Sequence, residues 1–190
     1  MIAFLIQIAD KSGYLAGAAW ILGFVALFIF FAVGGIFGPI NDAISVFQFL
    51  FMIPLALALH RSLAQYAFPL NLGATIVGIT VMLAMAVLQT LLVLGVIRFE
   101  QTLKPILALG AVLGLWWLAT SIPSLVHGVL PAGLAWVGIV AGASDIIGAV
   151  GFWIGGQEHP LAAISFAALA LSAPTWAIWL GRVLAAGAVL

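Results

Sequence analysis

The sequence predicts an all-α integral membrane protein, a bundle of six transmembrane helices joined by short loops. Hydrophobic residues make up 66% of the 190 residues, charged residues make up only 5%, and the mean hydropathy is +1.38. A water-soluble domain carries about 25% charged residues, because water must hydrate its surface. Apolar stretches recur along the whole chain, and the loops between them are too short for a soluble domain. We therefore predict a single transmembrane domain that covers residues 1–190.

The limits of the six spans follow from the charged residues, prolines and glycines that interrupt the apolar stretches. We predict spans at about 14–37, 43–59, 70–97, 105–126, 131–156 and 160–180. The second span is the shortest and contains Pro54, so five spans plus a re-entrant segment are an alternative. Residues 1–9 are too few to cross a core of about 30 Å. We expect them to lie at the interface or to lead into the first span.

Charge and residue content exclude several classes of function. The net charge is zero and no basic cluster is present, which argues against a nucleic-acid partner. The lack of cysteine excludes disulfides, thiolate catalysis and cysteine-ligated metals. The sequence contains no catalytic or metal-binding motif, so we expect the chain not to be an enzyme and not to hold a metal.

The few basic residues indicate an orientation. Six spans place both termini on one side of the membrane, and three basic residues share that side: Lys11, Arg61 and Arg182. Arg98 and Lys104 lie on the other side. Because cytoplasmic loops carry the excess of basic residues, we expect both termini to be cytoplasmic.

Asp145 is an acidic residue near the middle of a predicted span. It lies about 21 Å from Pro131 and about 20 Å from Glu158 along a helix that rises about 1.5 Å per residue. A charged side chain at this depth costs about 2.5–3.5 kcal/mol, and no Lys or Arg lies at a similar depth. We therefore expect the carboxyl group to be neutral and to face the bundle, on the helical face that carries Gly142.

Serine hydroxyls of similar depth are the candidate partners of this carboxyl group: Ser144, Ser121 and Ser172. One interpretation is structural, with Asp145 donating a hydrogen bond that fixes helix packing. A proton-coupled or ligand-binding acid and a water-filled pathway are the alternatives. Gln48 and Gln89 form a second polar layer, in which we expect a hydrogen bond between helices rather than a substrate site.

Two histidines are the candidate cofactor ligands of this chain. His60 and His127 lie at span ends, where they are interfacial anchors or, alternatively, axial ligands of a peripheral pigment or haem. The sequence requires no cofactor, although bound lipid, quinone or pigment is compatible with the aromatic helix faces. Most of the tryptophans fall toward span ends, where we expect an interfacial belt: Trp20, Trp136, Trp153, Trp176 and Trp179.

Small residues recur at helical spacing. Gly138 and Gly142 form one such pair, and Gly151 and Gly155 form another. Pairs of this kind let helix backbones approach closely in lipid. We expect them to serve packing within the chain; the interface of a homodimer is the alternative.

The second half of the chain carries a recognisable pattern. The run Leu113-Gly-Leu-Trp-Trp-Leu-Ala119 is followed by Gly128-Val-Leu-Pro and then by Trp136-Val-Gly-Ile-Val-Ala-Gly142. This order resembles a family of small bacterial multi-pass membrane proteins, the domain of unknown function 4386 type. The chain departs from the family at Ala132, where a basic residue is frequent. The resemblance implies a multi-pass protein of the bacterial cytoplasmic (inner) membrane and no particular activity.

Two hypotheses about function follow. The first is a non-catalytic accessory or structural subunit of a larger energy-transducing or transport complex, in contact with membrane lipids and other membrane subunits. It rests on the lack of soluble domains and the few polar groups within the spans. The second is a small autonomous proton-coupled transporter or ligand-binding sensor that uses Asp145. Transporters usually carry several ionisable groups along a path, which favours the first hypothesis.

Overall fold

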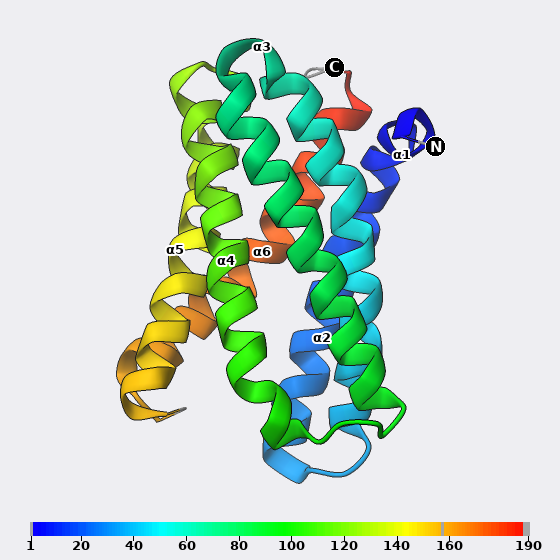
Figure 1. Ribbon diagram of the computed structural model, residues 1–190, viewed down its shortest axis with the longest axis vertical. Coiled ribbons are helices and arrows are strands. Elements are labelled where there is room, and N and C mark those ends of the chain that lie inside the picture. The colour runs from blue at the N-terminus through cyan, green and yellow to red at the C-terminus, as the bar shows by residue number, and fades with distance from the viewer. Residues whose placement is uncertain (1, 157, 188–190) are drawn as a thin grey trace.

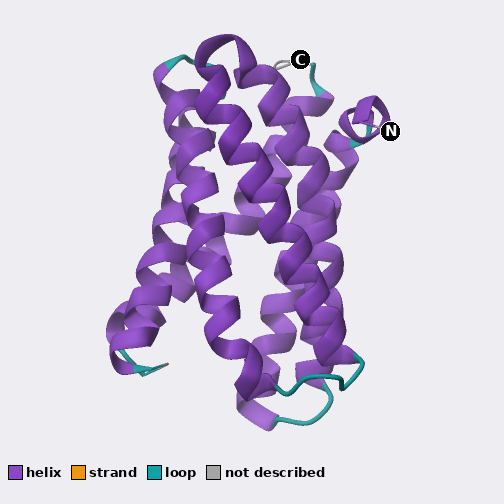
Figure 2. Ribbon diagram, viewed as in Figure 1, coloured by secondary structure: helices purple, strands orange, loops and turns teal. Residues whose placement is uncertain are grey.

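The computed structural model describes residues 2–156 and 158–187, except for the side chains at 67 and 68. In this part of the chain every regular element is an α-helix, and the loops are short (Figures 1 and 2). The helices are α1 (Ile2–Gln7), α2 (Ala9–Val33), α3 (Phe37–Val93), α4 (Phe99–Val126), α5 (Ala132–Gly155) and α6 (Pro160–Ala185). Six stretches of them are long and apolar enough to cross a membrane. The protein is therefore a six-helix transmembrane bundle, as predicted.

Helix α3 contains two of the six spans, because the chain reverses direction within it (Figure 1). Its arms are Phe37–Tyr66 and Pro69–Val93. Nδ2 of Asn71 donates a hydrogen bond of 2.7 Å across this turn to the carbonyl oxygen of His60. In a straight helix, residues this far apart in sequence would be separated by about 16 Å. The second span is thus a full crossing, and the alternative with five spans and a re-entrant segment is wrong.

The second span begins earlier than the predicted range 43–59. Gly34 and Gly35 adopt φ angles of 70° and 71°, which glycine tolerates without strain, and they separate α2 from α3. Helix α3 then begins at Phe37. Pro39 lies in its first turn, where a missing N–H leaves no helical hydrogen bond unmade. This proline therefore belongs to the helix rather than to a loop.

The third span is shorter than the predicted range 70–97. It ends at Val93, because Gly95 adopts a φ angle of 67° and turns the chain away. The N–H groups of Gly95 and Val96 donate hydrogen bonds of 2.9 Å back to carbonyl groups of the last helical turn. This pattern satisfies the free carbonyl groups that every helix end leaves.

Helix α4 begins earlier than the predicted residue 105. The side chain of Gln101 accepts a hydrogen bond of 2.9 Å from the N–H of Arg98 and so caps the first turn at Phe99. Helix α2 begins before the predicted residue 14 and ends at Val33 rather than 37, and α6 extends beyond 180. Helix α5 agrees with 131–156 to within one residue. The polar and charged residues at these span ends therefore belong to the helices, although their composition predicts loops.

The helices pack side by side in a ring. Helix α2 contacts α3 and α6, α5 contacts α4 and α6, and α3 contacts α4, so the order around the ring is α3, α2, α6, α5, α4. Both termini lie at the end of the bundle where α3 reverses (Figure 1). Helix α1 turns away from the axis of α2 at this end, as expected for an interfacial segment (Figure 1).

Glycine pairs mark the closest helix crossings. A Cβ atom on Gly13 would lie 2.6 Å from Cα of Gly181. A Cβ atom on Gly114 or Gly142 would lie 2.6 Å from the carbonyl oxygen of the other glycine. Backbone atoms cannot move aside, so these distances require glycine where α2 crosses α6 and where α4 crosses α5. Small residues therefore serve packing within the chain at these crossings.

Four tryptophans fill the centre of the ring. Trp116, Trp117 and Trp176 are at most 1% exposed. The ring centroid of Trp117 lies 5.9 Å from that of Trp176 and 6.2 Å from that of Trp20. The assignment of Trp20 and Trp176 to an interfacial belt is therefore wrong. Small residues on facing helices make room for the indoles, as at Gly138, where a Cβ atom would lie 2.7 Å from Nε1 of Trp176.

We predict that Gly13→Ala lowers the thermal stability of the protein in detergent, because the added methyl group would overlap the backbone of α6. The loss should be about 1–3 kcal/mol, as in other overpacked cores. Gly73→Ala is the matched control, since a Cβ atom there meets nothing within 4 Å and alanine favours the helix. Circular dichroism during heating measures both midpoints, and equal midpoints would contradict the prediction.

Candidate functional site

Asp145 lies midway along α5, and its side chain occupies the crossing with α4. A Cβ atom on Gly114 would lie 3.0 Å from Cβ of Asp145, and one on Gly110 would lie 3.5 Å from its Oδ1. The missing side chains of these two glycines create the space for the carboxyl group. The residue is half-buried, and Oδ2 is fully enclosed. Asp145 therefore faces the bundle, as expected from its helical face.

Helices α4 and α5 separate beyond Asp145. Gly142 still contacts α4, whereas Gly148 and Gly151 lie against α6. Figure 1 shows the end of the α5–α6 hairpin standing apart from the neighbouring ends of α2, α3 and α4. We call residues 146–155 and 160–168 the hairpin end, and the point where it leaves α4 the fork. Asp145 lies at the fork, midway along the α5 span.

Two of the three serines expected beside Asp145 bond or lie elsewhere. Oγ of Ser172 donates a hydrogen bond of 2.7 Å to the carbonyl oxygen of Ala168 in its own helix. Ser121 lies against Gly138, about 10 Å along α4 from Gly114, which contacts Asp145. Ser144 is buried. Within the described residues, Oδ2 of Asp145 has no hydrogen-bond partner.

The tryptophan cluster lies next to Asp145 on the side of the termini. Trp117 packs against Gly142, one helical turn before Asp145. The cluster therefore fills the ring between the carboxyl group and the end of the bundle that carries both termini. Its four indole nitrogens are buried and, in the part of the chain described, lack hydrogen-bond partners: Trp20, Trp116, Trp117 and Trp176. Each unpaired donor costs about 1–3 kcal/mol, which dispersion between the packed rings must offset.

Gln48 and Gln89 are both buried, at 4% and 7% exposure. Gln48 points toward α2, where a Cβ atom on Gly23 would lie 3.6 Å from its Oε1. Oε1 of Gln89 has no hydrogen-bond partner among the described residues. The hydrogen bond expected between the two glutamines is therefore not formed, because Gln48 turns to a different helix.

The two candidate haem or pigment ligands lie near the end of the bundle that carries the termini. The ring of His127 stacks on that of Tyr66, with 5.0 Å between centroids and 15° between planes. The carbonyl oxygen of His60 holds the turn of α3 through Asn71. Residues 2–156 and 158–187 contain no group of three His, Asp or Glu side chains that could hold a metal.

Sequence reasoning identified Asp145 but missed the residues that shape its surroundings. Gly110 and Gly114 provide the space on α4, and their spacing of four residues is the signal that was available. The resulting site offers one carboxyl group that can share a hydrogen bond or a proton with a group that reaches the fork. The expectation that the chain is not an enzyme stays a prediction.

Comparison with known proteins adds no assignment. The sequence matches no family model, no curated protein and no solved structure. The resemblance to the bacterial multi-pass family of unknown function therefore stays a prediction.

We predict that Asp145→Leu leaves the stability of the isolated protein unchanged or raises it by about 1–3 kcal/mol. Leucine removes a buried oxygen that has no partner in the described structure. Asp145→Asn retains a polar group of the same shape and is the matched comparison. Thermal midpoints in detergent measure the effect. A clear fall for Asp145→Leu would mean that the carboxyl group makes a stabilising internal bond.

Proposed function

We propose that the chain is a non-catalytic accessory subunit of a larger membrane assembly, and that a transmembrane helix of a partner docks at the fork beside Asp145. The observation that carries this proposal is the half-buried carboxyl group of Asp145, which makes no hydrogen bond among the described residues and of which only Oδ2 is fully enclosed. A donor or cation on the partner helix would complete the site. Energy-transducing and transport complexes are the assemblies in which we expect such a subunit.

Lipid cannot replace this partner. Hydrocarbon offers no hydrogen-bond donor, and a charged Asp145 alone at this depth costs about 2.5–3.5 kcal/mol. Ionisable side chains within membranes therefore pair with one another or with backbone groups. A hydrogen bond between helices in lipid contributes about 0.6 kcal/mol on average, and a charged partner would also remove the cost of the isolated acid. Asp145 thus favours binding of a helix that carries a donor or a cation over binding of lipid or of a purely apolar helix.

The hairpin end supplies contact area for the same neighbour. Trp153, Ile154 and Ile164 are 62%, 70% and 68% exposed. Lipid tails solvate such side chains as well as a partner helix does, so this surface alone gives no preference. Docking at the fork combines the apolar surface with the carboxyl group, which gives both packing and selectivity.

A small proton-coupled transporter or ligand-binding sensor is the second candidate. The half-burial of Asp145 favours it, because a carboxyl group that stays accessible near the midplane can exchange a proton or bind a small ligand. In that case the isolated chain is active and needs no partner subunit. Co-purification therefore separates the two functions.

We further propose that the protein lies in the bacterial cytoplasmic membrane with both termini in the cytoplasm. Basic residues support this orientation, since Lys11, Arg61 and Arg182 share the end of the termini. Lipids would surround the bundle. An absorption spectrum of the purified protein tests for haem or pigment at His60 or His127.

We predict that wild-type protein extracted in mild detergent co-purifies stoichiometrically with a larger complex, and that Asp145→Leu loses this complex. Ser144→Ala is the matched control, because Ser144 is the adjacent buried polar residue and carries no unpaired carboxyl group. Native gels and mass spectrometry measure the complex. A wild-type protein that stays a monomer or homodimer, with transport or ligand binding abolished in Asp145→Asn, would instead establish the second candidate.

We also predict a position-specific cross-link, which the lack of native cysteine makes straightforward. Leu103 lies two turns from Gly110 on the same face of α4, beside the fork. A bifunctional reagent should therefore link Leu103→Cys to the partner at least about ten times more efficiently than Leu115→Cys. Leu115 is 57% exposed but lies on the outer face of α4. Equal cross-linking at both positions would contradict docking at the fork.

A further inference from the structure

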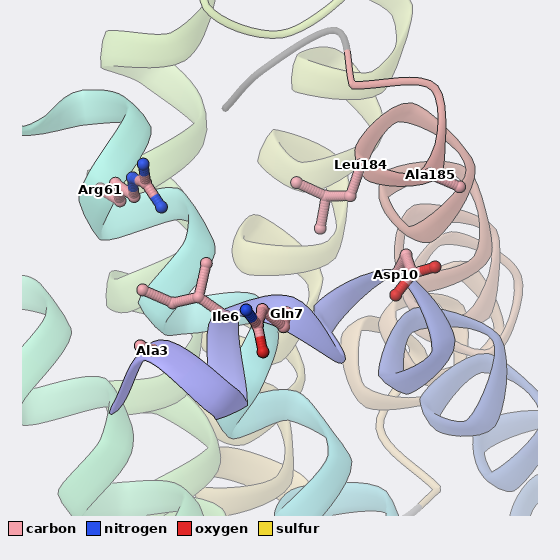
Figure 3. Close-up of a pocket in the computed structure, with 7 residues that line it drawn as sticks. All are labelled: Ala3, Ile6, Gln7, Asp10, Arg61, Leu184 and Ala185. Atoms are coloured by element: carbon pink, nitrogen blue, oxygen red, sulfur yellow. The ribbon is translucent and has the colours of Figure 1, made fainter. Parts of the chain in front are cut away.

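A pocket of about 310 Å³ opens at the end of the bundle that carries the termini. It lies between α1, the start of α2, the first arm of α3 and the last turn of α6 (Figure 3). Gln7, Asp10 and Arg61 supply its polar groups, and Ile6 and Leu184 supply most of its apolar wall. This pocket is at the opposite end of α6 from the hairpin end and shares no residue with the fork.

Asp10 and Arg61 bring opposite charges to this pocket without neutralising each other. In the described structure no ion pair joins them, so their charged atoms stay more than 4.0 Å apart. They come from different helices, and in Figure 3 Ile6 and Gln7 of α1 lie between them. A hollow with one positive and one negative group in its wall fits a ligand that carries both charges.

The position of the pocket indicates where such a ligand comes from. Helix α1 exposes Ile2 and Phe4 at 61% and 59%, as a short segment anchored in the membrane boundary would. Asp10 is the second residue of the α2 span, and Arg61 lies within the last two turns of the first α3 span. The phosphate and amine groups of phospholipids occupy this same layer on either side of the hydrocarbon core.

We infer that this pocket binds the headgroup of a phospholipid that carries a phosphate and a primary ammonium group, as phosphatidylethanolamine does. The guanidinium group of Arg61 donates to the phosphate oxygens, and the carboxylate of Asp10 accepts from the ammonium group. The amide of Gln7 adds a neutral hydrogen bond. The acyl chains continue along the apolar surface of the bundle.

The same chemistry predicts which lipids bind poorly. Phosphatidylcholine carries a quaternary ammonium group without N–H, so it cannot donate to Asp10. Phosphatidylglycerol has no cation and leaves Asp10 beside an anion. The pocket should therefore select for the primary amine and for the phosphate together, whereas a simple basic patch would favour the anionic lipid.

Native mass spectrometry of the delipidated full chain tests this inference with phosphatidylethanolamine, phosphatidylcholine and phosphatidylglycerol of identical acyl chains. We expect wild-type protein to retain phosphatidylethanolamine about ten times better than the other two lipids, which is the effect of one charge-assisted hydrogen bond. Arg61→Gln and Asp10→Asn should each reduce this retention about ten-fold. Lys11→Gln and Glu158→Gln, which remove charges outside the pocket, should retain it.

Several results would overturn the inference. One is equal retention of the three lipids by the wild type, a comparison that needs no variant to fold. Another is unchanged phosphatidylethanolamine binding in both pocket variants, with thermal midpoints checked against wild type. Soluble phosphoethanolamine serves as the competitor: if it binds as tightly as the lipid, a free metabolite replaces the lipid as the source of the headgroup. We expect it to compete only weakly.

Discussion

Helices α4 and α5 approach each other so closely at Gly114 and Gly142 that a methyl group on either residue would overlap the carbonyl oxygen of the other. In lipid the hydrophobic effect does not drive helices together, so association depends on packing of this kind. The crossing of α2 with α6 at Gly13 and Gly181 obeys the same constraint. These contacts close the ring, and the enclosed tryptophans then fill the space that the small residues leave. Asp145 owes its position to this arrangement, because it follows Gly142 by one turn.

Because of these crossings, the helices pack differently at the two ends of the bundle. At the end of the termini, Asn71 ties the turn of α3 to His60, Tyr66 stacks on His127, and the indole cluster fills the interior. At the other end the α5–α6 hairpin leaves its neighbours (Figure 1). Straight helices touch only near their crossing point and diverge on both sides of it. The short loop 127–131 joins α4 to α5 at the end of the termini, so the two helices separate freely only toward the other end. The fork is thus a geometric result of the crossing at the glycines.

Buried polar groups in this bundle differ in whether their own helix satisfies them. Hydroxyl groups are donors, so Thr120, Ser124 and Ser172 bond to carbonyl oxygens of the preceding turn in their own helix. The carboxyl group of Asp145 makes no such bond within its own helix, and its Oδ2 has no partner among the described residues. It therefore depends on a group from outside its helix.

Composition and hydropathy alone determined that the chain is all-α, that it has six spans and that Asp145 lies midway along one of them, because apolar length and charge position report where each span begins and ends. Composition and hydropathy do not determine which helices lie side by side. That Trp20 and Trp176 meet at the centre, that Gly110 and Gly114 make room for Asp145, and that Asp10 and Arg61 share a pocket became clear only in the tertiary structure. Depth is a property of each helix separately, whereas neighbours depend on which helices cross and where. A hydropathy pattern contains no information on which helices cross or where they cross.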